Sequence, residues 1–212
     1  MERRVELTFE LVCDVLQSAG LMTAEQRRDA GLREERERAR LLHGRMVGGK
    51  RHGGSAEEKV HPAEVLAAMG LFVNGDPRYP LTEEMIVQAL AQAIKVPYVH
   101  LDPLKIDAKL AAATLSRPFA RRHNALVIAG NETSVTVAVS NPLDVELEEN
   151  LRTFTRRDVK LVMAPPGDIQ RIITDIYGFR TSVTAAEREI KGEVDIGNLE
   201  RYVRLKRVEE IE

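Results

Sequence analysis

The sequence contains few of the residues that form disulfides, metal sites and aromatic cores. It has no tryptophan, 4% aromatic residues and a single cysteine, Cys13. A lone cysteine excludes an internal disulfide and a cysteine-based zinc site, and so few cysteines are typical of a cytoplasmic protein. The core of this 212-residue chain must therefore consist of aliphatic side chains, in one ordinary domain or two small ones.

Long apolar runs and an excess of one charge are absent as well. Glu6, Glu10 and Asp14 interrupt the apolar residues near the N-terminus, so we expect no signal peptide. No apolar run reaches the ~18 residues that a membrane-spanning helix needs. The chain has 31 basic and 33 acidic residues, a net charge of −2, which gives no reason to expect a nucleic acid as a partner.

Residues 1–44 predict an N-terminal helical region. An apolar stripe at helical spacing indicates the first helix: Val5, Phe9, Val12 and Leu16. Thr23 and Gln26 fit a capping box at the start of a second helix, in which Glu34 and Arg38 are spaced for an ion pair. Because its charges cancel, we interpret the second helix as solvated rather than as a nucleic-acid arm. The apolar stripe has two open interpretations: it binds a partner protein, or it packs on the second helix.

Residues 45–60 predict a flexible, glycine-rich linker. The stretch HGRMVGGKRHGG comes close to a phosphate-binding P-loop, since Gly44, Gly49 and Lys50 fall in register with that motif. However, Arg51 replaces the Ser or Thr that would hold magnesium, and the stretch follows a charged helix rather than a strand. We therefore interpret it as a linker and expect no nucleotide site in it.

Residues 61–178 predict a second structured part, helical over 61–96 and of α/β type over 97–178. In the helical portion, Thr82 is the expected N-cap of a helix with an acidic first turn. In the α/β portion, the runs ALVIA and SVTVAVS predict a hairpin, and DVKLVMA predicts a third strand. Helices on one face of this small mixed sheet would form a two-layer α/β sandwich, so the predicted fold class is α+β.

Two helices are expected around the third strand. Asn141 and Pro142 predict the N-terminus of the first helix. The residues that line it are Leu147, Leu151 and Phe154. The run DIQRIITDIYG predicts the second, amphipathic helix. Residues 179–212 predict a polar connector whose last helix stops without a cap, so we expect the chain to continue in a longer protein.

No constellation of residues in the sequence predicts catalysis or metal binding. The histidines show no metal-ligand spacing, and His100 and Asp102 share a face without a nucleophile nearby. The basic run RPFARRH could contact an acidic partner or anionic lipid, or form a solvated edge. The predicted partner-binding residues are Val5, Phe9, Val12, Leu16, Arg117, Arg121 and Arg122. We predict no catalytic, cofactor-binding or metal-binding residues and no cofactor in this chain.

Four segments of the chain carry a family resemblance. They are LTEEMIVQALAQAIKVPYVHLDP, RPFARRHNALVI, VTVAVSNPLDVELEENLRTFT and DIQRIITDIYGFR. In this order they resemble the N-terminal domains of type II secretion and type IV pilus assembly ATPases, of the GspE/PilB-like, MshE type. The tail from Ala186 to Glu212 is similar to the connector that precedes the ATPase core in one branch of that family.

The resemblance implies a non-catalytic docking and regulatory region of a larger enzyme. The full protein would be a hexameric ATPase at the cytoplasmic face of an inner membrane, with the ATPase core beyond Glu212. Its N-terminal region would bind the cytoplasmic part of an inner-membrane platform protein. The chain itself would be peripheral to the membrane, held there only through that partner.

One subgroup of these domains binds cyclic di-GMP, which gives the alternative function of a nucleotide sensor. The motif of the subgroup begins Arg-Leu-Gly and has a second glycine seven residues further on. Aligned on Gly70, this chain has His61 in the place of the arginine, and Ala93 replaces a final glutamine, although Ile86 and Leu90 keep the apolar positions. Aligned instead on the first helix, the motif also lacks its arginine. Since arginine suits contacts to guanine and phosphate, its loss argues against this alternative.

Overall fold

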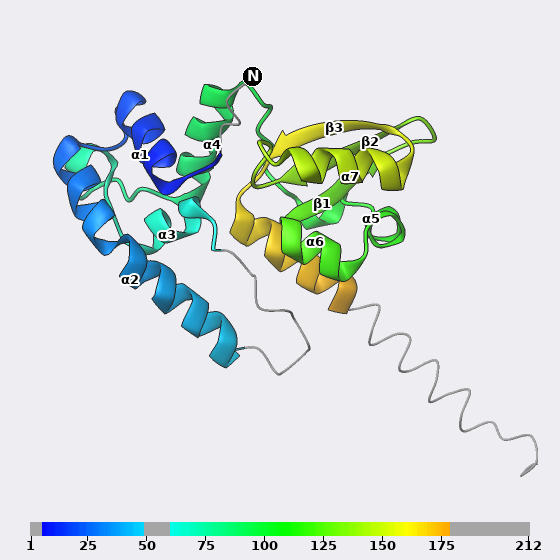
Figure 1. Cartoon of the computed structure of the whole chain (residues 1–212), viewed down its shortest axis with the longest axis horizontal. Helices are drawn as coiled ribbons and strands as arrows, with labels where there is room; N and C mark the ends of the chain where they lie inside the picture. The colour runs from blue at the N-terminus through cyan, green and yellow to red at the C-terminus, as the bar shows by residue number, and fades with distance from the viewer. Residues whose placement is uncertain (1–5, 49–59, 179–212) are drawn as a thin grey trace, which may run out of the picture. The chain divides into compact units, whose positions relative to one another are not determined.

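The structure is a computed structural model that describes residues 6–48 and 60–178 (Figure 1). The chain divides after Thr174 into two compact units, and the architecture below is that of the first unit. Val5, residues 49–59 of the predicted linker and the predicted connector 179–212 lie outside the described residues. The predicted roles of those segments stay predictions.

Four helices form the helical part of the unit: α1 (Phe9–Ser18), α2 (Ala24–Gly48), α3 (Pro62–Ala68) and α4 (Glu83–Ile94). Side-chain caps fix their beginnings. Thr82 accepts a hydrogen bond from the N–H of Met85, and Thr23 and Gln26 form the predicted capping box, each bonding the other's main-chain N–H at 3.1 and 2.9 Å. The predicted N-caps of α2 and α4 are therefore confirmed.

The apolar stripe of the first helix is buried inside the chain. Phe9, Val12 and Leu16 are at most 5% exposed, and α1 packs chiefly on α4 and to a lesser extent on α2 and α3. The interpretation that these side chains are free to bind a partner is therefore wrong. The interpretation that they pack on α2 is correct but incomplete, because α4 and α3 cover them as well. The physical reason is that α4 offers a wider apolar face, with Ile86 and Leu90 fully buried against the same core.

The ends of the predicted linker belong to structured parts. Helix α2 continues to Gly48, so Gly44 lies within a helix and not in a phosphate-binding loop. Val60 is 2% exposed and is part of the core of the helices. The predicted linker 45–60 is therefore too long at both ends. At its N-terminal end, the ion pairs on the surface of α2 support the helix beyond Gly44.

The α/β part contains short helices and a three-stranded sheet (Figure 1). In chain order its elements are η2 (Pro103–Lys105), α5 (Ala108–Thr114), α6 (Arg117–His123), β1 (Ala125–Gly130), β2 (Ser134–Val139), α7 (Val145–Thr155) and β3 (Asp158–Met163). A last helix covers 166–178. The 3₁₀ turn η1 (Val73–Gly75) lies in the loop between α3 and α4. The sheet order is β1-β2-β3.

The sheet is mixed, as predicted. β1 and β2 form the antiparallel hairpin, with a bulge between Val127 and Ala129, and β3 lies parallel to β2 after the α7 crossover. The apolar residues of β2 at alternating positions, Val135, Val137 and Val139, are all fully buried. Helices together with this small mixed sheet confirm the α+β class.

Three expectations for the α/β part need correction. RPFARRH forms helix α6, which Ser116 caps, although no helix was predicted for this run, which was interpreted as a contact for an acidic partner or anionic lipid or as a solvated edge. Asp144 rather than Asn141 caps α7, because the Asn141 side chain accepts the N–H of Leu143 in a turn of its own. Phe154 is 62% exposed and does not anchor α7 as Leu147 and Leu151 do. Among the described residues, no helix is both long and apolar enough to span a bilayer.

Candidate functional site

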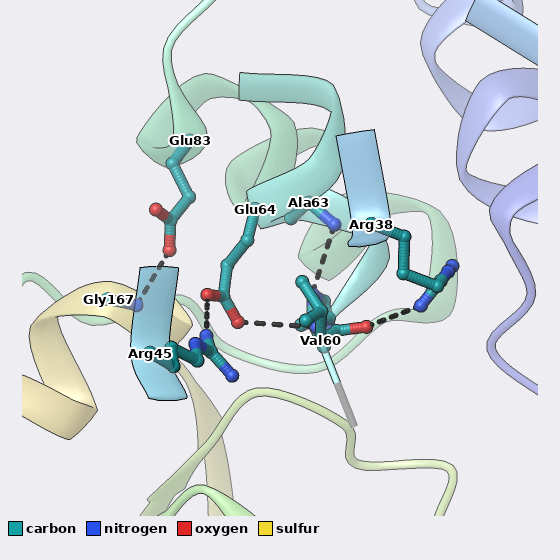
Figure 2. Close-up of polar contacts among 8 residues, drawn as sticks. Arg38, Arg45, Val60, Ala63, Glu64, Glu83 and Gly167 are labelled. Carbon is teal, nitrogen blue, oxygen red and sulfur yellow. Dashed lines mark hydrogen bonds and ion pairs between the residues drawn. The ribbon is translucent and has the colours of Figure 1, made fainter. Parts of the chain in front are cut away.

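A cluster of polar side chains lies where α2, α3 and α4 meet the α/β part. We call it the polar junction (Figure 2). Its side chains are those of Arg38, Arg45, His61, Glu64 and Glu83, and its main-chain groups are those of Val60, Ala63, Ser140 and Gly167. The sequence had singled out His61, as the residue in place of an arginine, and Arg38, as the partner of Glu34, but gave no reason to bring these side chains together.

His61 is a buried N-cap whose two ring nitrogens are both in use. Nδ1 accepts a hydrogen bond from the N–H of Ala63 at 3.1 Å, so it carries no proton. The proton of the neutral ring is therefore on Nε2, which lies 3.1 Å from the carbonyl oxygen of Ser140. Burial lowers the pKa of His61 to about 4; the bond to Ser140 opposes this shift, and the charge of Arg38 adds to it.

Glu64 completes a capping box at the same helix start. One carboxylate oxygen accepts the main-chain N–H of His61 at 3.3 Å, and the other pairs with the guanidinium of Arg45 near the end of α2. Arg38, two turns earlier on α2, donates to the carbonyl oxygen of Val60 at 2.8 Å. These contacts attach the second half of α2 to the beginning of α3.

Glu83 joins the first turn of α4 to the beginning of the helix over 166–178. Its carboxylate accepts the N–H of Gly167 at 2.8 Å, as Figure 2 shows. The pKa of Glu83 is raised, chiefly because burial disfavours the charged form, while the bond from Gly167 works in the opposite direction. A carboxylate at two helix N-termini is otherwise favourably placed.

The polar junction connects parts of the chain and offers no catalytic group. Both nitrogens of His61 and the carboxylates of Glu64 and Glu83 are bound to groups of the same chain. No nucleophile takes part in these contacts. In residues 6–48 and 60–178, no three metal-ligating side chains come together. These contacts join α2, α3 and α4 to the end of β2 and to the helix over 166–178.

A shallow hollow of about 510 Å³ lies around the His100–Asp102 pair. Its two cations face carboxylates: Lys105 lies 3.6 Å from Asp102, and Arg171 bonds Asp168 at 2.8 Å. The His100 ring lies 3.6 Å from Glu84. The remaining lining is mostly aliphatic. Because Lys105 and Arg171 each have a carboxylate partner, neither of these cations is left unpaired to select an anionic ligand.

The two predicted sets of partner-binding residues lie on different elements. Phe9, Val12 and Leu16 are in the core beneath α1, whereas the arginine set is on α6, which packs on β1. Arg121 and Arg122 are exposed in the last turn of α6, where positive charge suits the helix dipole, and Arg117 is half-buried. Their role in binding a partner stays a prediction.

Sequence reasoning missed the junction around His61, although one signal was present. A polar residue, then proline, then glutamate at the third helical position is the pattern of a capped helix start, and His61, Pro62 and Glu64 follow it. The contacts to Ser140 and Gly167 had no such signal, because they join residues 79 and 84 positions apart.

The chain is similar to known proteins over most of its length. Residues 94–183 match the MshEN domain model. The type IV pilus assembly ATPase TfpB of Acinetobacter baylyi (strain ATCC 33305 / BD413 / ADP1) is 26% identical over 148 residues, which cover 66% of this chain and 25% of the relative. The chain thus spans about a quarter of the length of that curated relative.

Solved structures give weaker similarity. A structure of MshE with cdg is 21% identical, with a TM-score of 0.48, covering 78% of this chain and 98% of the other. A structure of the N-terminal domain of XpsE is 13% identical, with a TM-score of 0.45, covering 82% and 96%. The domain match and the pilus assembly relative confirm the resemblance inferred from the four sequence segments.

Proposed function

Because residues 94–183 match the MshEN domain model, we propose that this chain is the N-terminal docking and regulatory region of an ATPase for type IV pilus assembly or type II secretion. The domain match is the observation that carries the proposal, and the similarity to a pilus assembly ATPase extends it. The whole protein would be a hexamer with its ATPase core after Glu212.

The region is non-catalytic and binds no cofactor of its own. The support for this is the use of its buried polar groups: His61, Glu64 and Glu83 all bond to the chain itself. The near-P-loop stretch begins within helix α2 and not after a strand, while residues 49–54 of it lie outside the described residues. The ATP-binding residues belong to the core that follows.

The partner is the cytoplasmic part of an inner-membrane platform protein, which places the ATPase at the membrane without a span of its own. Since the stripe of α1 is buried, the docking surface lies elsewhere. The exposed arginines of α6, Arg121 and Arg122, fit an acidic surface on that partner.

A capture experiment tests the proposal. The immobilised cytoplasmic domain of the platform protein encoded with the ATPase should retain this chain, and a chain with Arg121→Glu and Arg122→Glu should be retained less. The matched control is Arg156→Glu, an exposed arginine at the end of α7. If the platform domain fails to retain the unaltered chain, the docking function is refuted.

Cyclic di-GMP sensing is the second candidate function. In its favour, Gly20 and Gly70 both end a helix in the left-handed conformation, with φ of 69° and 66°, and the apolar positions Ile86 and Leu90 are fully buried. Against it, His61 stands where the motif has arginine, and both its nitrogens are engaged. Calorimetric titration with cyclic di-GMP, and with ATP as a control, should give no heat; micromolar or tighter binding would move sensing to first place.

A further inference from the structure

The outer side of α2 presents an apolar residue to solvent. Leu32 is 88% exposed, and Glu35, Arg36 and Ala39 beside it are exposed as well. At about 100° per residue, Leu32 and Ala39 lie nearly in line along the helix, since seven residues make almost two turns. Glu35 and Arg36 then lie on opposite flanks of that line. We call these four residues the outer stripe.

The two charges of the outer stripe have no partner among the described residues, unlike their neighbours. Three ion pairs on α2 use the surrounding charges: Arg33 with Asp29, Arg38 with Glu34, and Arg40 with Glu37. Neither Glu35 nor Arg36 takes part in an ion pair or a side-chain hydrogen bond in residues 6–48 and 60–178. The stripe thus combines an unburied leucine with two unpaired charges of opposite sign.

The orientation of α2 is fixed by contacts on its other side. Arg33 donates to the carbonyl oxygen of Met69 at 3.0 Å, and Arg38 donates to that of Val60 at 2.8 Å. Ala30 is fully buried on the same side. Figure 1 shows α2 at the margin of the helical part, beside α3. Because these contacts prevent α2 from rolling, the outer stripe cannot turn inward.

We propose that the outer stripe binds the same stripe of a second copy of this chain, with the two α2 helices side by side and parallel. In a parallel pair related by a two-fold axis, Leu32 meets Leu32 and Ala39 meets Ala39 of the second copy. Opposite flanks face each other in this arrangement, so Glu35 of each copy meets Arg36 of the other. Both unpaired charges are then satisfied, and the exposed leucines are buried.

Charge complementarity favours a second copy in this direction over an antiparallel one. In an antiparallel pair the same flanks face each other, so a pair centred between Glu35 and Arg36 would set Glu35 against Glu35 and Arg36 against Arg36. One heptad earlier, Arg28 and Asp29 occupy the same two flanks with the signs reversed, so an antiparallel pair centred on Leu32 would set Glu35 against Arg28 and Arg36 against Asp29. However, Asp29 already pairs with Arg33, and this arrangement would set Ala39 against Glu25. The parallel pair instead joins the two unpaired charges to each other and Ala39 to Ala39. The association does not depend on the docking function, and a longer oligomeric protein would strengthen it through effective concentration.

Charge exchange tests the association directly. Sedimentation equilibrium of the chain should show a fraction of dimer that increases as the protein concentration rises from micromolar to near-millimolar. Glu35→Arg or Arg36→Glu alone places like charges in contact and should weaken the dimer on the order of tenfold. The double variant Glu35→Arg with Arg36→Glu restores both pairs and should dimerise like the original chain. An equimolar mixture of the two single variants should form the heterodimer.

A cysteine introduced at position 39 tests whether the two helices are parallel. Ala39→Cys should form a disulfide between copies under mild oxidation, because the two positions meet in the parallel pair, and the buried Cys13 does not compete. All of these substitutions are at exposed positions of α2, so the fold is retained. A chain that stays monomeric throughout, or single variants whose mixture does not associate, would overturn the proposal. So would a dimer that Ala39→Cys fails to cross-link.

Discussion

The imidazole of His61 lies 3.1 Å from the carbonyl oxygen of Ser140, a residue 79 positions further along the chain. The contact joins the start of α3 to the end of β2 and is almost completely buried. Because the other ring nitrogen accepts the N–H of Ala63, protonation of His61 would remove an N-cap and leave a charge in the core.

The stability of the chain should therefore fall in mildly acidic solution. The folded pKa of His61 is lowered to about 4 from 6.5, so the unfolded chain binds the proton more readily between these values. Titration of His61 therefore leaves the free energy of unfolding unchanged above pH 6.5. Between pH 6.5 and 4 it lowers the free energy of unfolding by about 3 kcal/mol in total. Urea unfolding at a series of pH values measures it.

The matched control is His61→Asn, which can still cap α3 but does not titrate. Its free energy of unfolding should depend less on pH than that of the original chain, by up to ~1.4 kcal/mol for each pH unit in this window. Equal pH dependence of the two proteins would show that folding does not lower the pKa of His61.

The stability of the chain should depend on a hydrogen-bond acceptor at position 83 but not on the negative charge of Glu83. Burial raises the pKa of Glu83, so the charged form is held at a cost that Glu83→Gln removes while it keeps an acceptor for Gly167. At pH 7 we expect Glu83→Gln to be at least as stable as the original chain and Glu83→Ala to lose about 1 kcal/mol. Thermal unfolding followed by circular dichroism distinguishes them; a glutamine variant less stable than the alanine variant would contradict this account.

Leu16 should be important for folding, in contrast with an exposed leucine on the next helix. Leu16 is fully buried beneath α1, and its truncation to alanine should cost about 2 to 5 kcal/mol. The control Leu32→Ala, at a position 88% exposed, should change the free energy of unfolding by less than about 0.5 kcal/mol when measured on dilute protein. Similar losses for the two variants would mean that α1 does not pack as described.

Cys13 should resist modification as long as the chain is folded. The thiol is 2% exposed, and burial raises its pKa to about 11, so little thiolate is present at pH 8. Reaction with Ellman's reagent should be slow in buffer and immediate in denaturant. Rapid labelling of the folded chain would show that α1 opens readily from α4.

Local signals in the sequence predicted much of the secondary structure, while contacts between distant segments escaped them. Thr82 and the Thr23–Gln26 pair predicted the starts of their helices correctly, because a helix cap depends on residues only three positions apart. Near Asn141 two candidate caps competed, and the choice of Asp144 depended on a turn that Asn141 forms by itself. Helix α6 was not predicted, because the run of basic residues was interpreted by its charge and the N-cap at Ser116 was overlooked.

The candidate site was less predictable than the fold. An amphipathic pattern such as Phe9, Val12 and Leu16 tells that a face is buried but not which element covers it. The neutral state of His61 depends on burial by residues far along the chain, which no spacing rule reports. The four segments indicated the resemblance to secretion and pilus ATPases because they occur in the same order, not because any one of them forms a site.

Calorimetric titration of the platform protein's purified cytoplasmic domain into this chain tests the central claim most directly. A docking region predicts saturable, equimolar binding of micromolar or tighter affinity in the absence of any nucleotide, weakened by Arg121→Glu with Arg122→Glu. No heat of binding, from a chain shown by circular dichroism to be folded, would contradict the claim that this region docks the ATPase at the membrane.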